Sequence, residues 1–407
     1  MLIILSLYIA LHIFEFWLEY LNYQNLQKNC HNVPSEFADY IDGKKLDDTN
    51  RYTIEKMKLG IVTSLFSNAV TLVFIFGGLL SWYNSWINNF DMLYILSGIT
   101  FFLILGLAKG FLDIPFSLYS TFRIEKKYGF NTMTFKLWLS DGLKGIVLST
   151  VIISLVIAAA LWICGAVQQW WLPVWGFFLV FSLFMMYISP YVLEPLFNKF
   201  VPIDDVELEQ DIKDTIAKAG ITVSGVYKMD ASKRTKHSNA YFSGIGHVKR
   251  IVLYDTLLEQ LSKDELLGVL AHEAGHCKRK HIIINLVLMG IMLLVGSYVA
   301  FILLDNNYLA DLFEIEQASF FTKFILLNFV ASIALFPLGP LMNILSRIFE
   351  RQADDFAVEL MGTGEPLASA LIKLSKDNLS NMHPHPLYAK VHYSHPTAIE
   401  RIRRLRG

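Results

Sequence analysis

The segment LLGVLAHEAGHCKRKH contains the pattern HExxH, formed by His272, Glu273 and His276. Residues four apart on a helix share one face, so the two imidazoles can bind one metal ion. Glu273 directly follows the first histidine and can reach a water molecule beside that metal. Two core histidines satisfied by hydrogen bonds are the alternative, but they need several polar partners in an apolar setting. The pattern therefore predicts one zinc ion per chain, with Glu273 as the base for hydrolysis.

A catalytic zinc ion takes three protein ligands and leaves one position for water. The segment SRIFERQADDFAVEL offers Glu350, with Asp354 one helical turn later. We expect Glu350 to bind the metal and Asp354 to hydrogen-bond a ligand imidazole, which fixes its tautomer and basicity. The alternative is an ordinary helix face paired with Arg347 and Arg351. The ligand interpretation is favoured because few other carboxylates have such a context.

Other histidines near these segments are weaker candidates. His281 lies five residues after His276, which on a continuous helix turns it about 140° away, so we assign it a structural role. In the tail HPHPLYAKVHYSHPTAIERI, His395 precedes a helix-like stretch and is a candidate donor to the oxyanion of a tetrahedral intermediate. Three further tail histidines are weaker still: His383, His385 and His392.

The segment TKHSNAYFSG contains a candidate edge for binding a peptide substrate. Asn239 offers an amide to a peptide main chain, and the short strand after it can pair with an extended peptide. The strand residues are Ala240, Tyr241 and Phe242. The alternative is a turn asparagine that leads into a hairpin.

A small α/β unit is expected over residues 194–281 to position these groups. Its runs GVYKMD, NAYFSG and KRIVLYD are short and rich in β-branched and aromatic residues, and Gly244 and Gly246 mark a hairpin between the last two. The helix that carries HExxH follows, and Ser262 with Glu265 forms a capping-box pattern at its start.

The composition of the rest of the chain indicates a membrane protein. Hydrophobic residues make up 54% of the 407 residues and charged residues 17%, against about 45–50% and about 25% in soluble domains. Lipid is therefore a partner. The net charge of -1 gives no basic excess for nucleic acid, which we exclude as a partner. The oligomeric state stays open.

Seven apolar runs are long enough to cross a hydrocarbon layer of about 30 Å. They lie near residues 1–20, 60–82, 93–115, 144–165, 171–193, 282–304 and 322–342, although the last two are alternatively buried core helices. We divide the chain accordingly. The parts are 1–193 with transmembrane helices 1–5, 194–281 with the α/β zinc domain, 282–342 with transmembrane helices 6–7, and 343–407 with the third ligand and SHPT.

Basic residues gather in alternate connections between these runs. The first and third connections contain Lys28, Lys44, Lys45, Arg51, Lys56 and Lys58, then Arg123, Lys126, Lys127, Lys136 and Lys144. The connections between them contain one basic residue, Lys323. The positive-inside rule therefore places the basic loops, the segment 194–281 and the carboxyl tail in the cytoplasm, and the amino terminus outside.

Several motifs together resemble the CAAX prenyl protease 1 family, a group of membrane zinc endopeptidases. The motifs are HEAGH, SRIFERQAD, KRTKHSNAYFSG, KRIVLYDTLL, PLFNKFVP, YGFN and SHPT, and the resemblance covers roughly residues 50 to 407. It implies a seven-helix membrane barrel around a water-filled chamber, closed at its cytoplasmic end by the zinc domain. It also implies zinc ligands His272, His276 and Glu350, the base Glu273, and contacts of Asn239 and His395 with substrate or transition state.

We therefore predict a mainly α integral membrane protein, with about seven transmembrane helices enclosing a chamber and a small α/β zinc-metalloprotease domain. The resemblance implies removal of the last three residues from a prenylated C-terminal CAAX peptide. One alternative is a metalloprotease for quality control of membrane proteins. Another is a channel or transporter with structural zinc, which would need no base such as Glu273. The membrane would be the plasma membrane in a bacterium and the endoplasmic reticulum in a eukaryote, with the active site facing the cytoplasm.

Overall fold

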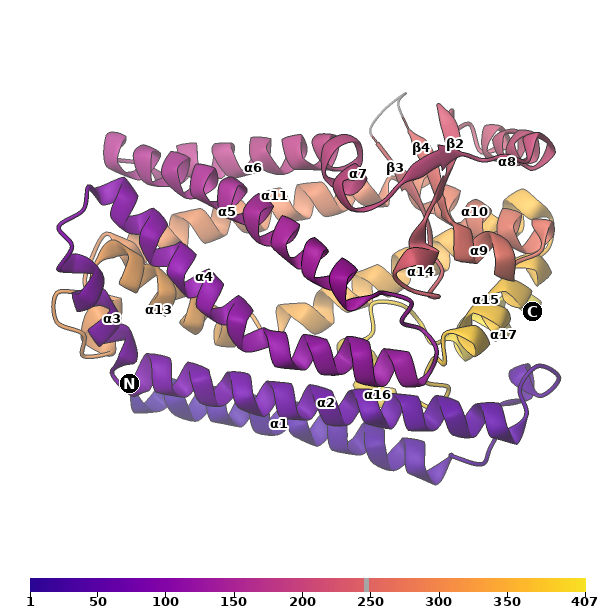
Figure 1. The fold of residues 1–407 in the computed structure, drawn as a ribbon, viewed down its shortest axis with the longest axis horizontal. Helices are drawn as coiled ribbons and strands as arrows, with labels where there is room; N and C mark the ends of the chain where they lie inside the picture. The colour runs from indigo at the N-terminus through magenta and orange to yellow at the C-terminus, as the bar shows by residue number, and fades with distance from the viewer. Residues whose placement is uncertain (245–248) are drawn as a thin grey trace.

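Long apolar helices run along most of the molecule in the computed structural model, which describes residues 1–244 and 249–407 (Figure 1). In hydrocarbon a helix satisfies its own backbone polar groups, so long apolar runs take this form. Among the described residues, six helical stretches are long and apolar enough to cross a membrane. They are α1 (Leu2–Lys28), α2 (Gly43–Phe76), α4 (Tyr94–Tyr119) with the π-helical turn η2 (Ser120–Glu125), α5 (Phe135–Ala166), α6 (Trp171–Ile188) with η3 (Ser189–Leu193) and α7 (Glu194–Phe197), and α11 (His281–Leu304).

The seventh apolar run forms two helices instead of one straight span. α13 (Phe320–Ala334) and α14 (Leu338–Met361) meet at an angle of 60°. The sequence FPLGP runs from the break into the first turn of α14, and proline both lacks an N–H and disfavours a helical residue before it. The run predicted near 322–342 therefore ends inside α14, whose later turns leave the apolar region and carry Glu350.

The apolar helices do not pack as a solid bundle. Within their apolar windows only 6–17% of the residues are buried by other parts of the protein. A helix in a filled bundle buries a stripe at least about 100° wide, which is more than a quarter of its surface. α4 lies against α5 and α6 against α11, whereas α1 and α2 lie on the opposite side of the molecule from α6 (Figure 1). The spans therefore form an open arrangement with apolar surface on several faces.

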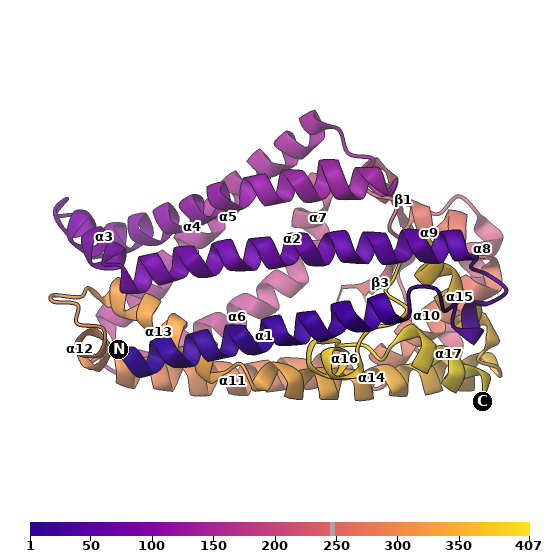
Figure 2. The ribbon, with the colours of Figure 1, turned by 90° about the horizontal axis from the view of Figure 1, so that it is seen from below.

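The connections between spans lie at two opposite ends of the elongated molecule (Figures 1 and 2). One end holds the N-terminus, α3 (Leu79–Asn88) and α12 (Tyr308–Leu312). Buried Asn84 joins the connections there, because it accepts a hydrogen bond from Thr322 Oγ1 at 2.8 Å and donates one to the Gln317 carbonyl at 3.2 Å. The small sheet and the C-terminus lie at the other end.

A four-stranded mixed sheet follows α7. Its strands are β1 (Phe200–Pro202), β2 (Gly225–Met229), β3 (Ala240–Ser243) and β4 (Arg250–Tyr254), in the order β1-β2-β4-β3. β2 and β4 are parallel, whereas β3 pairs antiparallel with β4 in the predicted hairpin, with Ala240 opposite Leu253. Gly244 has φ +90 at the end of β3, and Gly246 lies outside the described residues. The strand β3 is at the edge of the sheet.

The remaining helices pack against the sheet, against one another or against α1 and α14. They are α8 (Val206–Lys218), α9 (Asp255–Gln260), α10 (Lys263–Lys278), α15 (Glu365–Asp377), α16 (Pro386–His392) and α17 (Ala398–Arg406), with the short turns η1 (Ser35–Phe37) and η4 (Ala231–Lys233). Fully buried Ile212 of α8, Ile251 of β4 and Leu270 of α10 belong to one apolar cluster. This core fixes α10 between the sheet and the helices α14 and α15.

Candidate active site

The N-terminus of α10, which precedes the HExxH residues, is held in place by Glu265. Glu265 accepts a hydrogen bond from the Ser262 backbone N–H at 2.7 Å, which completes the predicted capping box. The same carboxylate accepts hydrogen bonds from Ser369 Oγ at 2.6 Å and Lys373 Nζ at 2.7 Å on α15. Burial alone would raise the pKa of Glu265, but these hydrogen bonds lower it to about 2. The carboxylate thus ties α10 to α15.

A close approach of two helices brings the histidines to Glu350. A Cβ placed on Gly275 would lie only 2.8 Å from the Cα of Ala353. The backbones of α10 and α14 are therefore in direct contact at this point. Gly275 is the glycine of HEAGH, immediately before His276. A larger side chain at this position would push the ligand helices apart.

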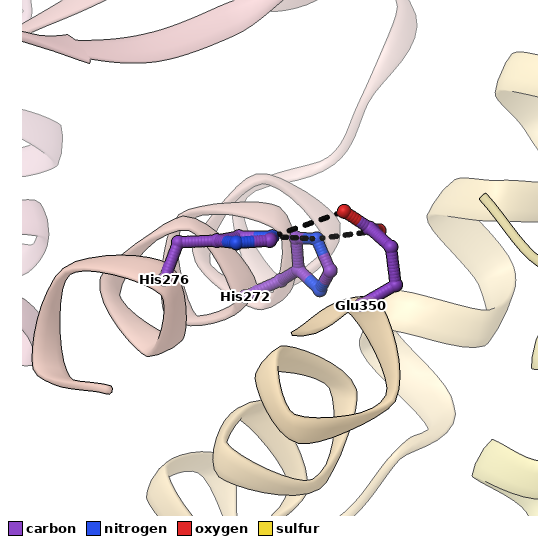
Figure 3. Close-up of side chains that lie close together, drawn as sticks. All are labelled: His272, His276 and Glu350. Carbon is purple, nitrogen blue, oxygen red and sulfur yellow. Dashed lines mark hydrogen bonds and ion pairs between the residues drawn. The ribbon is translucent and has the colours of Figure 1, made fainter. Parts of the chain in front are cut away.

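The three predicted ligands converge on one point (Figure 3). His272 Nε2 lies 3.3 Å from His276 Nε2 and 3.4 Å from Glu350 Oε2. His276 Nε2 lies 3.2 Å from Glu350 Oε1. Ligand atoms at the corners of a tetrahedron with bonds of about 2.0–2.1 Å are about 3.3–3.4 Å apart. Each histidine nitrogen therefore lies at the spacing of neighbouring tetrahedral ligands from the other nitrogen and from one oxygen of Glu350, which is Oε2 for His272 and Oε1 for His276.

A bound metal ion would also satisfy a carboxylate oxygen that hydrogen bonds leave unsatisfied. Glu350 is 4% exposed, and its Oε2 has no hydrogen bond of acceptable geometry within the described residues, although His395 Nδ1 lies 2.9 Å away. A carboxylate is only an acceptor, and an imidazole whose Nδ1 holds the proton presents a lone pair at Nε2. Three lone-pair donors that face one another are the expected environment of a cation. The residues present fit a bound divalent metal.

Asp354 and Arg401 hold His272 from behind. Asp354 Oδ1 lies 2.8 Å from His272 Nδ1, the contact that the one-turn spacing from Glu350 predicts. Arg401 of α17 donates to both carboxylate oxygens of Asp354, from Nε at 3.0 Å and from Nη2 at 2.6 Å. Its Nη1 lies 3.6 Å from Glu350 Oε2. Sequence reasoning missed Arg401, whose signal is weak: an arginine six residues after His395, on a helix capped by Thr397.

His281 lies beside the site, contrary to the expected turn away from it. The expectation assumed one continuous helix, but α10 ends at Lys278 and Lys280 adopts a left-handed φ of 59 before α11 begins. The chain reversal brings His281 Nδ1 to 3.0 Å from His276 Nδ1. Its Nε2 lies 2.9 Å from Gln352 Oε1, and its ring stacks on Phe349 at 4.2 Å. His281 therefore contacts a predicted ligand without being one of the three clustered atoms.

Glu273 is partly buried on α10, next to His272. It makes no hydrogen bond or ion pair within residues 1–244 and 249–407. Burial raises the pKa of its carboxyl group. A carboxylate with a raised pKa and no competing partner has the properties of a proton acceptor that later returns the proton.

Of the predicted substrate contacts, His395 touches a predicted metal ligand, whereas Asn239 leads into the edge strand. The His395 ring is 61% exposed and meets the site through Glu350. Asn239 is exposed, its Oδ1 accepts the Ala240 N–H at 2.9 Å, and its carbonyl accepts the Tyr254 N–H at 3.1 Å. The edge strand that follows Asn239 packs against α10.

The residues of the edge strand and the other tail histidines have structural contacts. Tyr241 donates to Glu194 Oε2 at 2.9 Å, and Phe242 packs on the apolar core. His383 Nε2 lies 2.7 Å from the Asn32 carbonyl, His385 caps α16, and the His392 ring lies 4.6 Å from that of Tyr388. These three tail histidines hold the segment around α16.

Models of two protein families match the chain almost end to end. The first, the N-terminal part of CAAX prenyl proteases with five membrane helices, matches residues 22–199. The second, peptidase family M48, matches residues 202–407 and so contains all three clustered ligands.

Whole proteins are similar over the same length. CAAX prenyl protease 1 of Saccharomyces cerevisiae is 34% identical over 98% of this chain and 94% of its own length. The CAAX prenyl protease 1 homolog of Oryza sativa subsp. japonica is 33% identical over 98% and 95%, and that of Homo sapiens is 31% identical over 94% and 90%. The chain belongs to the CAAX prenyl protease 1 family. Its structure is similar to the crystal structure of S. mikatae Ste24p, with a TM-score of 0.92 and 31% identity over 99% of this chain and 98% of that one.

Membership of this family confirms the predicted resemblance and the predicted fold class, a mainly helical membrane protein with a small sheet. The chain is a multi-pass integral membrane metallopeptidase of family M48. The alternative of a channel or transporter with structural zinc is therefore excluded. Peptides are its substrates, and a metal bound by two histidines and a glutamate is its cofactor.

Proposed function

We propose that this chain is a zinc endopeptidase that removes the C-terminal tripeptide from prenylated CAAX peptides. The observation that supports it best is the convergence of His272 and His276 on the Glu350 carboxylate, in which each Nε2 lies 3.2–3.4 Å from the other Nε2 and from one of the two carboxylate oxygens. Two imidazoles and a carboxylate are a donor set typical of catalytic zinc, which keeps a further position open. The substrate class is proposed from the names of relatives that match along the whole chain.

In this proposal His272, His276 and Glu350 hold one zinc ion. Zinc supplies a Lewis acid that polarises a carbonyl and makes water more acidic. Asp354 keeps the His272 ring in one tautomer with Nε2 available, and Arg401 keeps Asp354 in place. His281 restrains the His276 ring from its other nitrogen.

Glu273 performs the proton transfers. Its carboxylate takes a proton from the attacking water and returns it to the leaving amine, so no covalent intermediate forms. Burial raises the pKa of Glu273, which favours return of the proton to the leaving group. His395, with a largely exposed ring next to Glu350, is the proposed donor to the oxyanion.

The edge strand provides the binding surface for the substrate backbone. An extended peptide that pairs with Ala240, Tyr241 and Phe242 would be held along α10, and the Asn239 amide would fix its register. Such positioning holds the scissile bond near the metal ligands.

We propose further that the sheet end faces the cytoplasm. The loops rich in lysine and arginine join the spans at this end, whereas Lys323 is the single basic residue of the opposite connections. The membrane would be the plasma membrane in a bacterial cell and the endoplasmic reticulum in a eukaryotic one. Single cysteines at Lys45 and Lys126, in a chain without its three native cysteines, should react with impermeant reagents only from the cytoplasmic side. A cysteine at Asn88 should react only from outside, and the reverse pattern would overturn this orientation.

Mass spectrometry of cleavage products tests the activity and the substrate together. Purified protein is given a farnesylated CAAX peptide, its unprenylated copy and an unfolded membrane protein. We expect loss of three residues from the farnesylated peptide and much slower cleavage of the others. Glu273→Gln should be inactive, and Glu259→Gln, at a glutamate of α9 outside the site, serves as the matched control. Cleavage of the unfolded protein without preference for farnesyl would instead support quality control.

A further inference from the structure

A basic pocket opens where α5 meets the zinc-binding end of the molecule. It has a volume of 570 Å³ and is lined by the start of α5, the connection from α7 to β1, and residues around η4 and β4. Its charged lining residues are Lys144, Lys199, Lys233, Arg234, Arg250 and Asp230. Five positive groups and one carboxylate make this pocket strongly basic, although the whole chain has a net charge of -1.

Part of this positive charge is not compensated by nearby carboxylates. Three of the cations have acidic partners: Lys233 with Asp230 at 2.5 Å, Arg234 with Asp141 at 2.9 Å, and Arg250 with Glu194 at 3.6 Å. Lys144 donates only to the Leu196 carbonyl, at 3.1 Å, and the Lys199 ammonium has no acidic partner within the described residues. Both lysines are exposed. The pocket therefore presents two free positive charges.

One nitrogen of a buried guanidinium in the pocket also lacks a hydrogen-bond partner within the described residues. Arg250 is 9% exposed, and its Nε has no hydrogen-bond partner within the described residues. Its guanidinium lies 5.1 Å from the ring centre of Phe200 and 5.7 Å from that of Tyr227, and one Nη donates to the Pro190 carbonyl. A buried N–H donor without an acceptor is costly, and the oxygens of a phosphate are well suited to arginine.

The pocket lies at the depth of lipid headgroups. The apolar run of α5 begins directly after Lys144, and that of α6 and η3 ends directly before Glu194. Each run has about 20 residues, enough to cross about 30 Å of hydrocarbon. The hydrogen bond between Lys144 and Leu196 shows that the two chain segments leave the apolar region side by side. Leu137 and Phe197 add apolar walls to the same pocket.

We propose that this pocket binds the phosphate of an anionic phospholipid headgroup. Lys144, Lys199 and Arg250 contact the phosphate, Leu137 and Phe197 form apolar walls of the pocket beside the headgroup, and the acyl chains extend along the apolar runs of α5 and α6 on the membrane side of Lys144 and Glu194. Basic pockets between transmembrane helices at the cytoplasmic boundary are known to select anionic headgroups. The bound lipid would link the membrane helix α5 to the sheet. The proposal rests on the membrane spans and the pocket, and is independent of the peptidase substrate.

Native mass spectrometry of the detergent-purified chain tests this proposal. Phosphatidylglycerol and phosphatidylcholine are titrated against the wild type and against the double variant Lys144→Gln/Lys199→Gln. We expect the wild type to prefer phosphatidylglycerol and the double variant to bind it roughly 25-fold more weakly, from about fivefold for each lysine. The control Lys44→Gln/Lys45→Gln removes the same charge from the same end outside the pocket and should change binding less than about twofold. Equal binding by the pocket variant and the wild type, or equal binding of the two lipids, would overturn the proposal.

Two further arms identify the ligand and its position. Water-soluble glycerol 3-phosphate should displace phosphatidylglycerol poorly. Displacement at equal concentration would show that the pocket binds free phosphates and would overturn the proposal of a bound lipid. A phosphatidylglycerol with a photoreactive group near its headgroup should crosslink the wild type within residues 137–144 or 195–200. Crosslinks confined to other segments would contradict the proposed position, whatever the stability of the variants.

Discussion

The membrane helices are loosely packed, whereas the helix α10 is closely packed. The spans bury only 6–17% of their apolar windows, whereas nine of the 16 residues of α10 are buried. Lipid can cover a loosely packed apolar helix at little cost, but a metal site requires ligand atoms within a few tenths of an ångström. The fold therefore concentrates close packing around His272 and His276 and leaves the spans open. This contrast predicts where substitutions are tolerated.

Glu273→Gln should have the largest effect on activity, because it removes the proton acceptor without removing a ligand. We expect peptidase activity to fall roughly 100- to 10,000-fold while bound metal is unchanged. Cleavage of a farnesylated peptide and elemental analysis of the same sample measure both quantities. Activity near the wild-type rate would exclude Glu273 as the base.

Gly275→Val should show the difference in packing between the zinc-binding end and the membrane spans most clearly. A Cβ at Gly275 would collide with the Ala353 backbone at 2.8 Å, so the substitution should destabilise the zinc-binding end by about 1–3 kcal/mol or more and weaken metal binding. A Cβ at Gly106 of α4 would meet no neighbouring element within 4 Å among the described residues, which makes Gly106→Val the matched control in the spans. Thermal unfolding in detergent compares them. Equal effects of the two substitutions would contradict the proposed difference in packing.

His281→Ala should weaken metal binding about 10- to 100-fold, because His276 loses the group that restrains its second nitrogen. Asp354→Asn should act similarly on His272. Titration with a competing chelator measures the affinities, and His383→Ala provides a histidine control outside the site. Unchanged affinity in His281→Ala would reduce that residue to a packing role.

Glu265 should give a smaller, pH-dependent effect. Its folded pKa, about 2, is below the ordinary value of 4.5, so its contribution to stability is present above about pH 4.5 and is lost as the pH falls toward 2. Glu265→Gln should therefore lower stability near pH 6 by about 1–2 kcal/mol, and the difference from wild type should shrink at lower pH. Unfolding midpoints at several pH values test this, and a difference that stays constant with pH would contradict the assigned ion pair with Lys373.

Sequence periodicity predicted the parts of this site that lie on one helix at a time. His272 and His276 share a face through their spacing of four, and Glu350 and Asp354 do the same on α14. The edge strand after Asn239 was also predictable, because short strands and glycines are local signals. These features depend only on neighbouring residues.

The missed contacts depend on chain reversals and on packing between distant helices. His281 returns to His276 only because Lys280 takes a left-handed conformation, which no helical period encodes. Arg401 reaches Asp354 because α17 packs against α14, although the two residues are 47 positions apart in the chain. The 60° bend between α13 and α14 was readable in FPLGP, but the apolar run across it obscured the break.

The identity of the three metal ligands is the central claim, and zinc stoichiometry tests it most directly. Elemental analysis of the purified wild type should give one zinc per chain, and Glu350→Ala should give less than about a tenth of that, because two histidines alone bind the ion weakly. Glu359→Ala is the matched control, since Glu359 lies on the same helix with a side chain that is 70% exposed. We predict one zinc per chain for this control. A full zinc ion in purified Glu350→Ala would contradict the assignment of Glu350 as the third ligand.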